Sequence, residues 1–250
     1  MSLVSDVLGE SWNLYKTHWR HLLTIAFVVY LAVAVIGSIL VALLTWLGFV
    51  LAALIALVAL LWLQAVLVKA IEDIRDGRAD LSFEETFEAA QAHLAAVLVA
   101  GLIAVIGIGV GFALFIVPGL LLATIWAVII PAIVVEGRSA GESFGRSLEL
   151  VRGHFWSVLG LVVLLLLVVW GLPRLLDVLL QPLADWLQSF VSQIVAGTLT
   201  APFFALVLTV LYFRLRGATE VAGAPPTPPP PAEEPPAEAP PEEPPPAQPR

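Results

Sequence analysis

The sequence has no cysteine and very few charged residues. Asp, Glu, Lys and Arg together make up only 13% of its 250 residues, whereas soluble domains contain about 25%. The absence of cysteine excludes disulfide bonds and thiolate metal sites. Because 60% of the residues are hydrophobic, the composition indicates an integral membrane protein rather than a soluble domain.

Two long stretches without any formal charge can each provide two membrane crossings. A transmembrane helix needs about 20 apolar residues, and the stretches Leu22–Val68 and Leu94–Val135 are each about twice that long. We expect a turn at Thr45–Gly48 in the first stretch and at Val117–Gly119 in the second. Each stretch therefore predicts a pair of antiparallel helices.

Two shorter apolar stretches complete the expected set. Phe155–Leu172 provides one crossing, ended by Pro173, and Trp186–Phe213 provides another. All of these runs are continuously apolar, whereas the strands of a membrane barrel alternate between polar and apolar residues. The sequence thus predicts an all-α membrane protein with six transmembrane helices arranged as three hairpins, in a membrane domain of residues 1–216. The expected spans are about 22–44, 49–70, 94–116, 119–136, 155–172 and 188–213.

The basic residues predict the orientation of the protein. Lys and Arg collect on the cytoplasmic side of a membrane protein, and six crossings place both termini on one side. Ten basic residues then share that side, and Arg174 falls on the other. We therefore expect a multi-pass protein of the cell membrane with both termini in the cytoplasm. The ten residues are Lys16, Arg20, Lys69, Arg75, Arg78, Arg138, Arg146, Arg152, Arg214 and Arg216.

Residues 217–250 differ from the rest of the chain because they are rich in proline and glutamate. Such a segment cannot bury enough apolar surface to fold, and its prolines favour extended conformations. We expect a disordered cytoplasmic tail that serves as a solvated spacer, with docking to a proline-binding domain as the alternative.

A charged segment beginning at Ser139 separates the fourth and fifth spans. Ser139 and Glu142 match the capping-box pattern, in which each side chain binds the free backbone N–H of the other residue. Apolar residues follow at helical spacing, which indicates an amphipathic helix on the membrane surface. On its polar side, we expect Glu142 to pair with Arg146 and Glu149 to pair with Arg152.

The same amphipathic pattern occurs three times. In a register without gaps, His18, His93 and His154 each precede the last of four apolar positions, and a second capping box is expected at Ser82 and Glu85. A rival register aligns the tripeptides ESW, ETF and ESF but requires an insertion in the third copy. Each copy predicts a cytoplasmic-side amphipathic helix before a hairpin. The apolar positions are Leu8, Trp12, Tyr15 and Trp19, then Phe83, Phe87, Ala90 and Leu94, then Phe144, Leu148, Val151 and Phe155.

Candidate chemical groups are sparse. The three histidines could form a metal site or a proton relay, but histidine also suits the boundary between water and lipid. Glu136, at the inner end of the fourth span, is either a functional carboxylate or an interfacial residue that ends the helix. Pro131 and Pro202 each remove a backbone hydrogen bond and predict kinks. Gly107 and Gly111 have the spacing of close helix contacts. We expect no cofactor and no bound metal.

Residues 117–160 carry a more specific pattern. A Pro-Gly turn leads through a span with a tryptophan to the pattern P-x-x-x-x-E-G, followed by a helix with the pattern E-S-x-x-R-S, then a glycine and an aromatic pair. This combination resembles the membrane domain associated with bacterial glycerophosphoryl diester phosphodiesterases and related bacterial membrane proteins. The matching positions are Pro118, Gly119, Trp126, Pro131, Glu136, Gly137, Glu142, Arg146, Ser147, Gly153, Phe155 and Trp156.

The resemblance implies a six-span membrane module and marks a small set of candidate functional or structural residues. In the bifunctional relatives, the phosphodiester chemistry belongs to a separate soluble barrel with His-Arg and Glu-Asn signatures. This chain contains neither signature, so the resemblance carries no phosphodiesterase activity to it. The candidate residues are Pro131, Glu136, Gly137, Glu142, Arg146 and Ser147.

Three functions are compatible with the sequence. The first is a non-enzymatic membrane module that organises lipids or partner proteins; its partners would be membrane lipids, other membrane proteins or a second copy of the chain, but no nucleic acid. The second is a transporter or channel-like protein for an apolar or amphipathic solute. The third is an intramembrane enzyme that uses Glu136, Arg146 and the histidines. The sequence favours the enzyme least of the three, because no nucleophile, base and orienting group occur at a fixed spacing.

Overall fold

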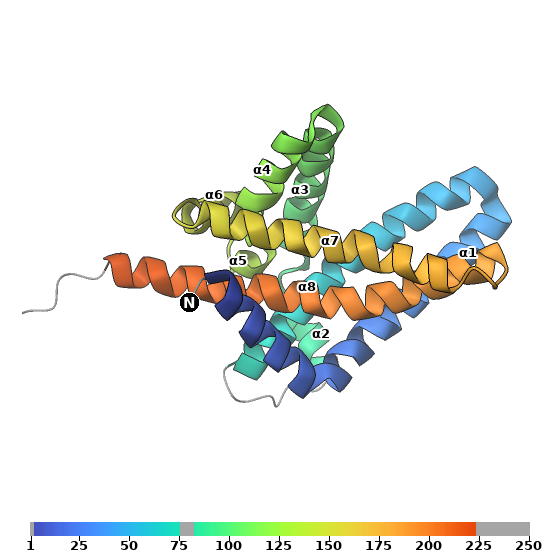
Figure 1. Ribbon diagram of the computed structural model, residues 1–250, viewed down its shortest axis with the longest axis horizontal. Coiled ribbons are helices and arrows are strands. Elements are labelled where there is room, and N and C mark those ends of the chain that lie inside the picture. The colour runs from blue at the N-terminus through green and yellow to red at the C-terminus, as the bar shows by residue number, and fades with distance from the viewer. Residues whose placement is uncertain (1–2, 76–82, 224–250) are drawn as a thin grey trace, which may run out of the picture.

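The computed structural model describes residues 3–75 and 83–223, and all regular secondary structure in these two ranges is helical. The predicted all-α class is therefore confirmed (Figure 1). Several of the helices are long and apolar enough to cross a membrane. In chain order the helices are α1 (Leu3–Arg75), α2 (Phe83–Gln91), α3 (Leu94–Leu114), α4 (Ile116–Ile125), α5 (Ile129–Glu136), α6 (Ala140–Arg152), α7 (Phe155–Leu179) and α8 (Asp185–Gly223).

Helix α1 folds back on itself at Thr45, within the predicted turn. The φ angle of Thr45 is +50°, and the two sections of α1 on either side of it run back along each other (Figure 1). A Cβ atom on Gly37 would lie 3.6 Å from the Cβ of Ala52, which is ordinary contact. A Cβ atom on Gly48 would lie only 1.9 Å from the carbonyl oxygen of Leu40. Glycine is therefore required at position 48 for the two sections to approach closely.

Helices α3 and α4 also lie side by side, but the break between them precedes the predicted turn. The break lies at Phe115, and Pro118 belongs to the first turn of α4. Proline is tolerated there because the first N–H groups of a helix have no partner within the helix. A Cβ atom on Gly111 would lie 2.9 Å from the Cα of Gly119. The small-residue spacing in α3 thus marks a helix contact within the chain.

The prolines inside the long helical stretches have different effects. Pro131 lacks the N–H group that would bind the carbonyl of Ala127, and the helix is interrupted between the end of α4 and the start of α5. The kink predicted at Pro131 is confirmed. By contrast, α8 is continuous across Pro202. Pro173 does not end its helix as expected, because α7 continues through it to Leu179.

Helix α8 also extends beyond the predicted start of the disordered tail. The tail was expected from residue 217, but α8 ends at Gly223. The first proline of the tail is Pro225, and proline disfavours helical backbone at the residue before it. The helix can therefore continue until the proline-rich sequence is reached. The rest of the tail, residues 224–250, lies outside the described residues.

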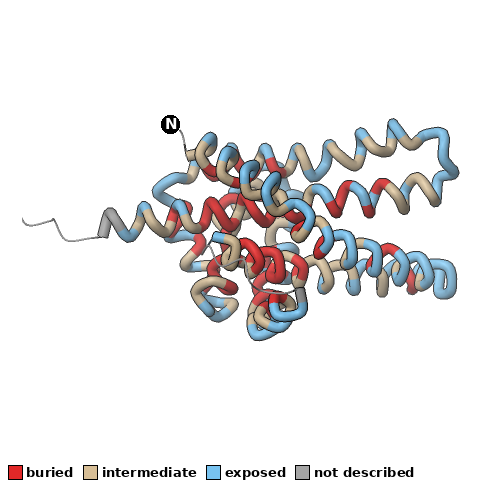
Figure 2. The backbone as a smooth tube through the Cα atoms, turned by 90° about the horizontal axis from the view of Figure 1, so that it is seen from below, coloured by how far each residue is buried: buried red, intermediate tan, exposed pale blue. Residues whose placement is uncertain are grey.

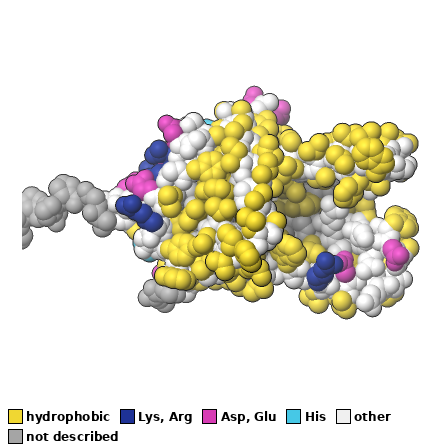
Figure 3. Space-filling model, turned by 90° about the horizontal axis from the view of Figure 1, so that it is seen from above, with side chains coloured by type: hydrophobic (Ala, Val, Ile, Leu, Met, Phe, Trp, Pro, Cys, Tyr) yellow, Lys and Arg dark blue, Asp and Glu magenta, His cyan; other side chains and the backbone are white. Residues whose placement is uncertain are grey.

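Buried side chains form two adjoining clusters at one end of the long helices (Figure 2). One cluster joins the second half of α1 to α3 and α5 and includes Leu67 and Ile133. The other joins α7 to α8 and includes Leu165 and Leu211. The outer faces are apolar as well (Figure 3), and the Trp46 side chain at the tip of α1 is 76% exposed. An exterior of this kind is typical of helices that meet lipid or another protein.

Three amphipathic segments repeat one pattern of burial. They are the first section of α1, α2 and α6, and they bury Ser11, Thr86 and Ser143 completely. These residues are the middle positions of ESW, ETF and ESF, so the burial favours the rival register. The third segment is longer by about one helical turn, which keeps its histidine and its hydroxyl on the same relative faces.

The aromatic residue that follows each buried hydroxyl contacts a ring from a different long helix. All three contacts are edge-to-face, with ring centroids 5.0 to 6.4 Å apart. Through them α2 packs on the end of α1, α6 packs on the residue that follows α4, and the first section of α1 packs on α8. The pairs are Phe87 with Trp62, Phe144 with Trp126, and Trp12 with Phe203. The last of these contacts joins the beginning of the described chain to its final helix.

Candidate functional site

The carboxylate of Glu136 lies where α5 ends and the chain turns into α6. Gly137 ends the helix with a φ angle of +66°, a left-handed conformation that favours glycine. Ser139 then caps α6, and Ser139 and Glu142 form the reciprocal capping box. This predicted capping box is confirmed, whereas the one expected at Ser82 lies outside the described residues.

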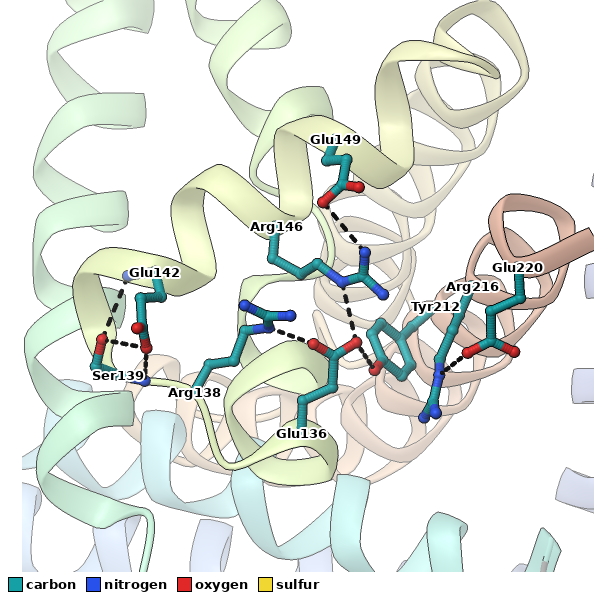
Figure 4. A network of polar contacts seen from close by, with 9 residues as sticks. All are labelled: Glu136, Arg138, Ser139, Glu142, Arg146, Glu149, Tyr212, Arg216 and Glu220. Atoms are coloured by element: carbon teal, nitrogen blue, oxygen red, sulfur yellow. Dashed lines mark hydrogen bonds and ion pairs between the residues drawn. The ribbon is translucent and has the colours of Figure 1, made fainter. Parts of the chain in front are cut away.

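Three side chains donate hydrogen bonds to Glu136 (Figure 4). Its Oε1 atom accepts from the Tyr212 hydroxyl at 2.5 Å and from Nε of Arg146 at 3.0 Å. Its Oε2 atom accepts from Nε of Arg138. These donors come from α8, from α6 and from the connection between α5 and α6. One carboxylate therefore ties three parts of the fold together.

The ion pair between Glu136 and Arg146 is largely shielded from solvent. The exposed fractions of the two side chains are 12% and 13%. Arg146 also binds Glu149, with 3.1 Å between Nη1 and Oε2. Burial lowers the pKa of Arg146, but its bonds to Glu136 and Glu149 outweigh this effect and raise the pKa above its usual value. Arg146 therefore keeps its charge, and the cluster neutralises that charge internally.

The predictions of two ion pairs along α6 are wrong. Glu142 does not pair with Arg146, because its carboxylate accepts hydrogen bonds from the hydroxyl and the backbone N–H of Ser139. These bonds lower the pKa of Glu142. Glu149 pairs with Arg146 instead of Arg152. Spacing along one helix could not show that a carboxylate from the preceding helix would attract Arg146.

Ser147 forms hydrogen bonds with the backbone at the interruption between α4 and α5. Its side chain is fully buried. The hydroxyl donates to the carbonyl oxygen of Ile125 at 2.7 Å and accepts from the N–H of Val128 at 3.3 Å. Both backbone groups belong to the stretch where the regular hydrogen bonds of the helix stop. Because unpaired buried backbone groups are costly, Ser147 stabilises the broken helix.

An apolar cavity of about 290 Å³ lies beside this break. It is lined by the second half of α1 together with α3, α4, α5, α7 and α8. Among the residues that line it, only Gln64 and Trp126 carry polar side-chain atoms. Pro131 also faces the cavity, and Ala104 and Ala205 are among its small lining residues. The interrupted stretch between α4 and α5 therefore forms part of the lining of the cavity.

The three histidines occupy equivalent breaks in the backbone. His18 lies at the first break in α1, His93 immediately precedes α3, and His154 immediately precedes α7. Their φ angles are −114°, −101° and −132°, and their ψ angles are 18°, −1° and 25°. Each histidine thus marks the bend from an amphipathic segment into a long helix. Within the described ranges, no group of three or more potential metal-ligating side chains is present.

A second ion cluster joins the first section of α1 to the end of the same helix and to α8. Glu10 pairs with Arg75 at 3.1 Å and with Arg214 at 2.7 Å. Arg75 ends α1, and Arg214 lies on α8. As with Glu136, a carboxylate fastens an amphipathic segment to the ends of long helices. This role of Glu10 was not predicted, although the glutamate of ESW was part of the repeated pattern.

Tyr212 is the residue of the Glu136 cluster that sequence reasoning did not identify. The available signal was a tyrosine in an apolar span, two residues before the first basic residue of that span's inner end. A phenol at such a position commonly needs a hydrogen-bond partner when it is buried, and Tyr212 is fully buried. Its partner could not be predicted, because Glu136 is distant in sequence.

The arrangement around Glu136 is suited to holding helices together. Each carboxylate oxygen already accepts from a donor of the protein, and the cation of Arg146 is shared between two carboxylates. The cluster therefore anchors the walls beside the apolar cavity.

A comparison with known families covers most of this arrangement. The family described as "Domain of unknown function (DUF7847)" matches residues 81–215, which is more than half of the chain. The chain belongs to the DUF7847 family. The match includes the Glu136 cluster, Ser147, Tyr212, His93 and His154, whereas His18 and Glu10 lie before it. No curated protein and no solved structure shows significant similarity to the chain.

Proposed function

We propose that this DUF7847 protein is a six-span module of the cell membrane with both termini in the cytoplasm. In this proposal the two long sections of α1 form the first pair of crossings, α3 with α4 and α5 the second, and α7 with α8 the third. The apolar outer faces support it, as does the collection of basic residues at one end of these helices. Each pair follows an amphipathic segment that would lie on the cytoplasmic surface.

Within that membrane module, we propose that the apolar cavity holds part of a lipid, such as a hydrocarbon chain. The observation that carries this proposal is the cavity of about 290 Å³ with an almost entirely apolar lining. An engineered apolar cavity of about 150 Å³ binds benzene, so an apolar pocket about twice as large can take a short length of hydrocarbon chain. The protein would then organise lipids without changing them chemically.

The ion clusters support this function by fixing the walls of the cavity. Glu136 ties α5 to α6 and α8, and α5 and α8 both line the cavity. Ser147 stabilises the interrupted helix at the same wall. We also propose a relation to the membrane domain of glycerophosphoryl diester phosphodiesterases. Of the residues in that resemblance, Trp126 and Pro131 line the cavity, and Glu136 and Arg146 form the ion pair beside it.

The proposal that the cavity holds a lipid chain can be tested by photolabelling and by filling the cavity with a larger side chain. A phospholipid with a diazirine at the end of one acyl chain would be photolysed with the protein in nanodiscs, and labelled peptides would be mapped by mass spectrometry. We expect labels on cavity residues of α3 and α5, and their loss in Ala104→Phe. The matched control is Ile106→Phe, at a side chain on the same helix that is 57% exposed. Labels confined to exposed faces of the wild-type protein would contradict the proposal.

A second candidate function is the movement of an apolar or amphipathic solute. The observation that favours it is the interruption between α4 and α5 in the wall of the cavity, because a broken helix can bend more readily than a continuous one. A fluorescent phospholipid would then exchange between the leaflets of proteoliposomes, and Ala104→Phe would slow the exchange. Exchange no faster than in protein-free liposomes would leave the static lipid-holding function.

A further inference from the structure

The basic residues at the proposed cytoplasmic end fall into paired and unpaired sets. Most of them bind a carboxylate within the protein, through Glu10, Glu72, Glu136 or Glu220. Among the described basic residues at this end, Lys16, Arg20 and Arg152 form no ion pair. Because a paired cation is already neutralised, only the unpaired ones offer their full charge to an external anion.

Two of the unpaired cations flank the first histidine break. Lys16 and Arg20 are exposed and stand on either side of His18. The ammonium group of Lys16 lies 5.8 Å from the ring centroid of Trp12, and the guanidinium of Arg20 lies 5.4 Å from that of Trp19. Cation–π contacts position a cation without cancelling its charge. Tryptophan is also enriched at the level of lipid headgroups.

A surface hollow continues from these cations along α1. It is lined by Arg20, His21, Thr24 and Val28. Arg20, Thr24 and Val28 are spaced four residues apart, so they follow one another along a single face of the helix. Exposed apolar side chains continue further along the helix, including Leu31. The face therefore changes from cationic through polar to apolar within a few turns.

We propose that Lys16 and Arg20 bind the phosphate of an anionic phospholipid, whose acyl chain then follows the apolar face of α1. The order of cationic, polar and apolar residues along this face matches the order of groups in a phospholipid. The phosphate would lie at the cations and the hydrocarbon beyond Val28. The site is separate from the apolar cavity and does not depend on it. Each basic residue near an anionic membrane surface contributes about a fivefold gain in affinity, so two such residues give about 25-fold.

The experiment compares lipid binding by two double variants of the full chain. The probe is phosphatidylglycerol, titrated into the detergent-solubilised protein and counted by native mass spectrometry, with phosphatidylcholine of the same chains as the neutral reference. Lys16→Gln with Arg20→Gln removes the unpaired cations. Arg174→Gln with Arg216→Gln removes the same charge from arginines that are paired with Asp177 and Glu220.

We expect the Lys16 and Arg20 double variant to bind phosphatidylglycerol about 25-fold more weakly, with an unchanged melting temperature and unchanged binding of phosphatidylcholine. The control double variant should stay within about twofold of the wild type. An equal loss in both double variants would overturn the site, because net charge alone would then explain binding. Competition by free glycerol phosphate at the same concentration as the lipid would also overturn it, since the ligand would then be a soluble phosphate.

Discussion

Around Glu136, donors from separate parts of the fold converge on one carboxylate, whereas around His18 two cations rest on tryptophan rings without a carboxylate partner. Both regions lie at the same end of the long helices. Arg146 is 13% exposed, while Arg20 and Lys16 are exposed. The comparison indicates that the cations that hold the helices together and those that can meet a lipid headgroup are different residues.

The largest expected effect concerns the carboxylate at the centre of the first region. Glu136→Ala leaves Arg146 largely buried without its main partner, and we expect the free energy of unfolding to fall by about 3 kcal/mol. Reversible unfolding in detergent, followed by tryptophan fluorescence, measures this change. The matched control is Glu149→Ala, which removes the other carboxylate bound to Arg146 but is 52% exposed. That control should lose less than about 1 kcal/mol; equal losses would show that shielding from solvent is irrelevant here.

The next largest effect concerns the hydrogen bonds of Ser147 at the interruption between α4 and α5. Ser147→Ala leaves the carbonyl of Ile125 and the N–H of Val128 unpaired in a buried place, and we expect a loss of about 2 kcal/mol. Ser143→Ala is the control, because Ser143 is equally buried but donates only to Ala140 within its own helix. Unfolding measurements that give the two variants the same stability would contradict the proposed role of Ser147.

A smaller effect is expected from removing one phenol oxygen. Tyr212→Phe deletes the 2.5 Å hydrogen bond to Glu136, and a hydrogen bond to a charged group contributes about 1.5 kcal/mol. Tyr15→Phe is the control, since its hydroxyl donates at 3.3 Å to the neutral carbonyl of Leu199 and should contribute about 0.5 kcal/mol. A larger loss in the Tyr15 variant would remove the distinction between charged and neutral acceptors.

The smallest effect is a local dependence on pH at the start of α6. The folded protein lowers the pKa of Glu142 through hydrogen bonds from Ser139. A lowered pKa gives stability above the unfolded value of about 4.3, and this stability is lost as the pH falls through the lower folded value. Amide hydrogen exchange in the first turn of α6 should therefore quicken in that acidic range, corrected for intrinsic rates. Glu142→Gln should show no such step.

Local patterns in the sequence predicted much of the fold. The apolar runs predicted the long helices, Thr45 lay within an expected turn, and the spacing of Ser139 and Glu142 predicted the cap of α6. These features depend on residues that are near one another in sequence. The prediction failed where one residue type has several outcomes, as at Pro131, which interrupts its helix, and Pro173, which does not.

The candidate site was less predictable because its contacts are not local. Glu136 and Arg146 were recognised as candidates, but their pairing with each other and with Tyr212 depends on how α5, α6 and α8 pack. The same limit applies to the unpaired cations. The sequence placed ten basic residues at one end, and only the structure separates Arg214, which binds Glu10, from Arg20, which forms no ion pair among the described residues.

The most direct test of this separation is the rise in melting temperature that phosphatidylglycerol produces, measured for the wild type, Arg146→Gln and Arg20→Gln. A lipid that binds only the folded protein raises its stability. The account predicts that Arg146→Gln melts at a lower temperature without lipid but gains as much as the wild type. Arg20→Gln should melt like the wild type without lipid and gain less. The account is contradicted if Arg146→Gln abolishes the gain while Arg20→Gln retains it.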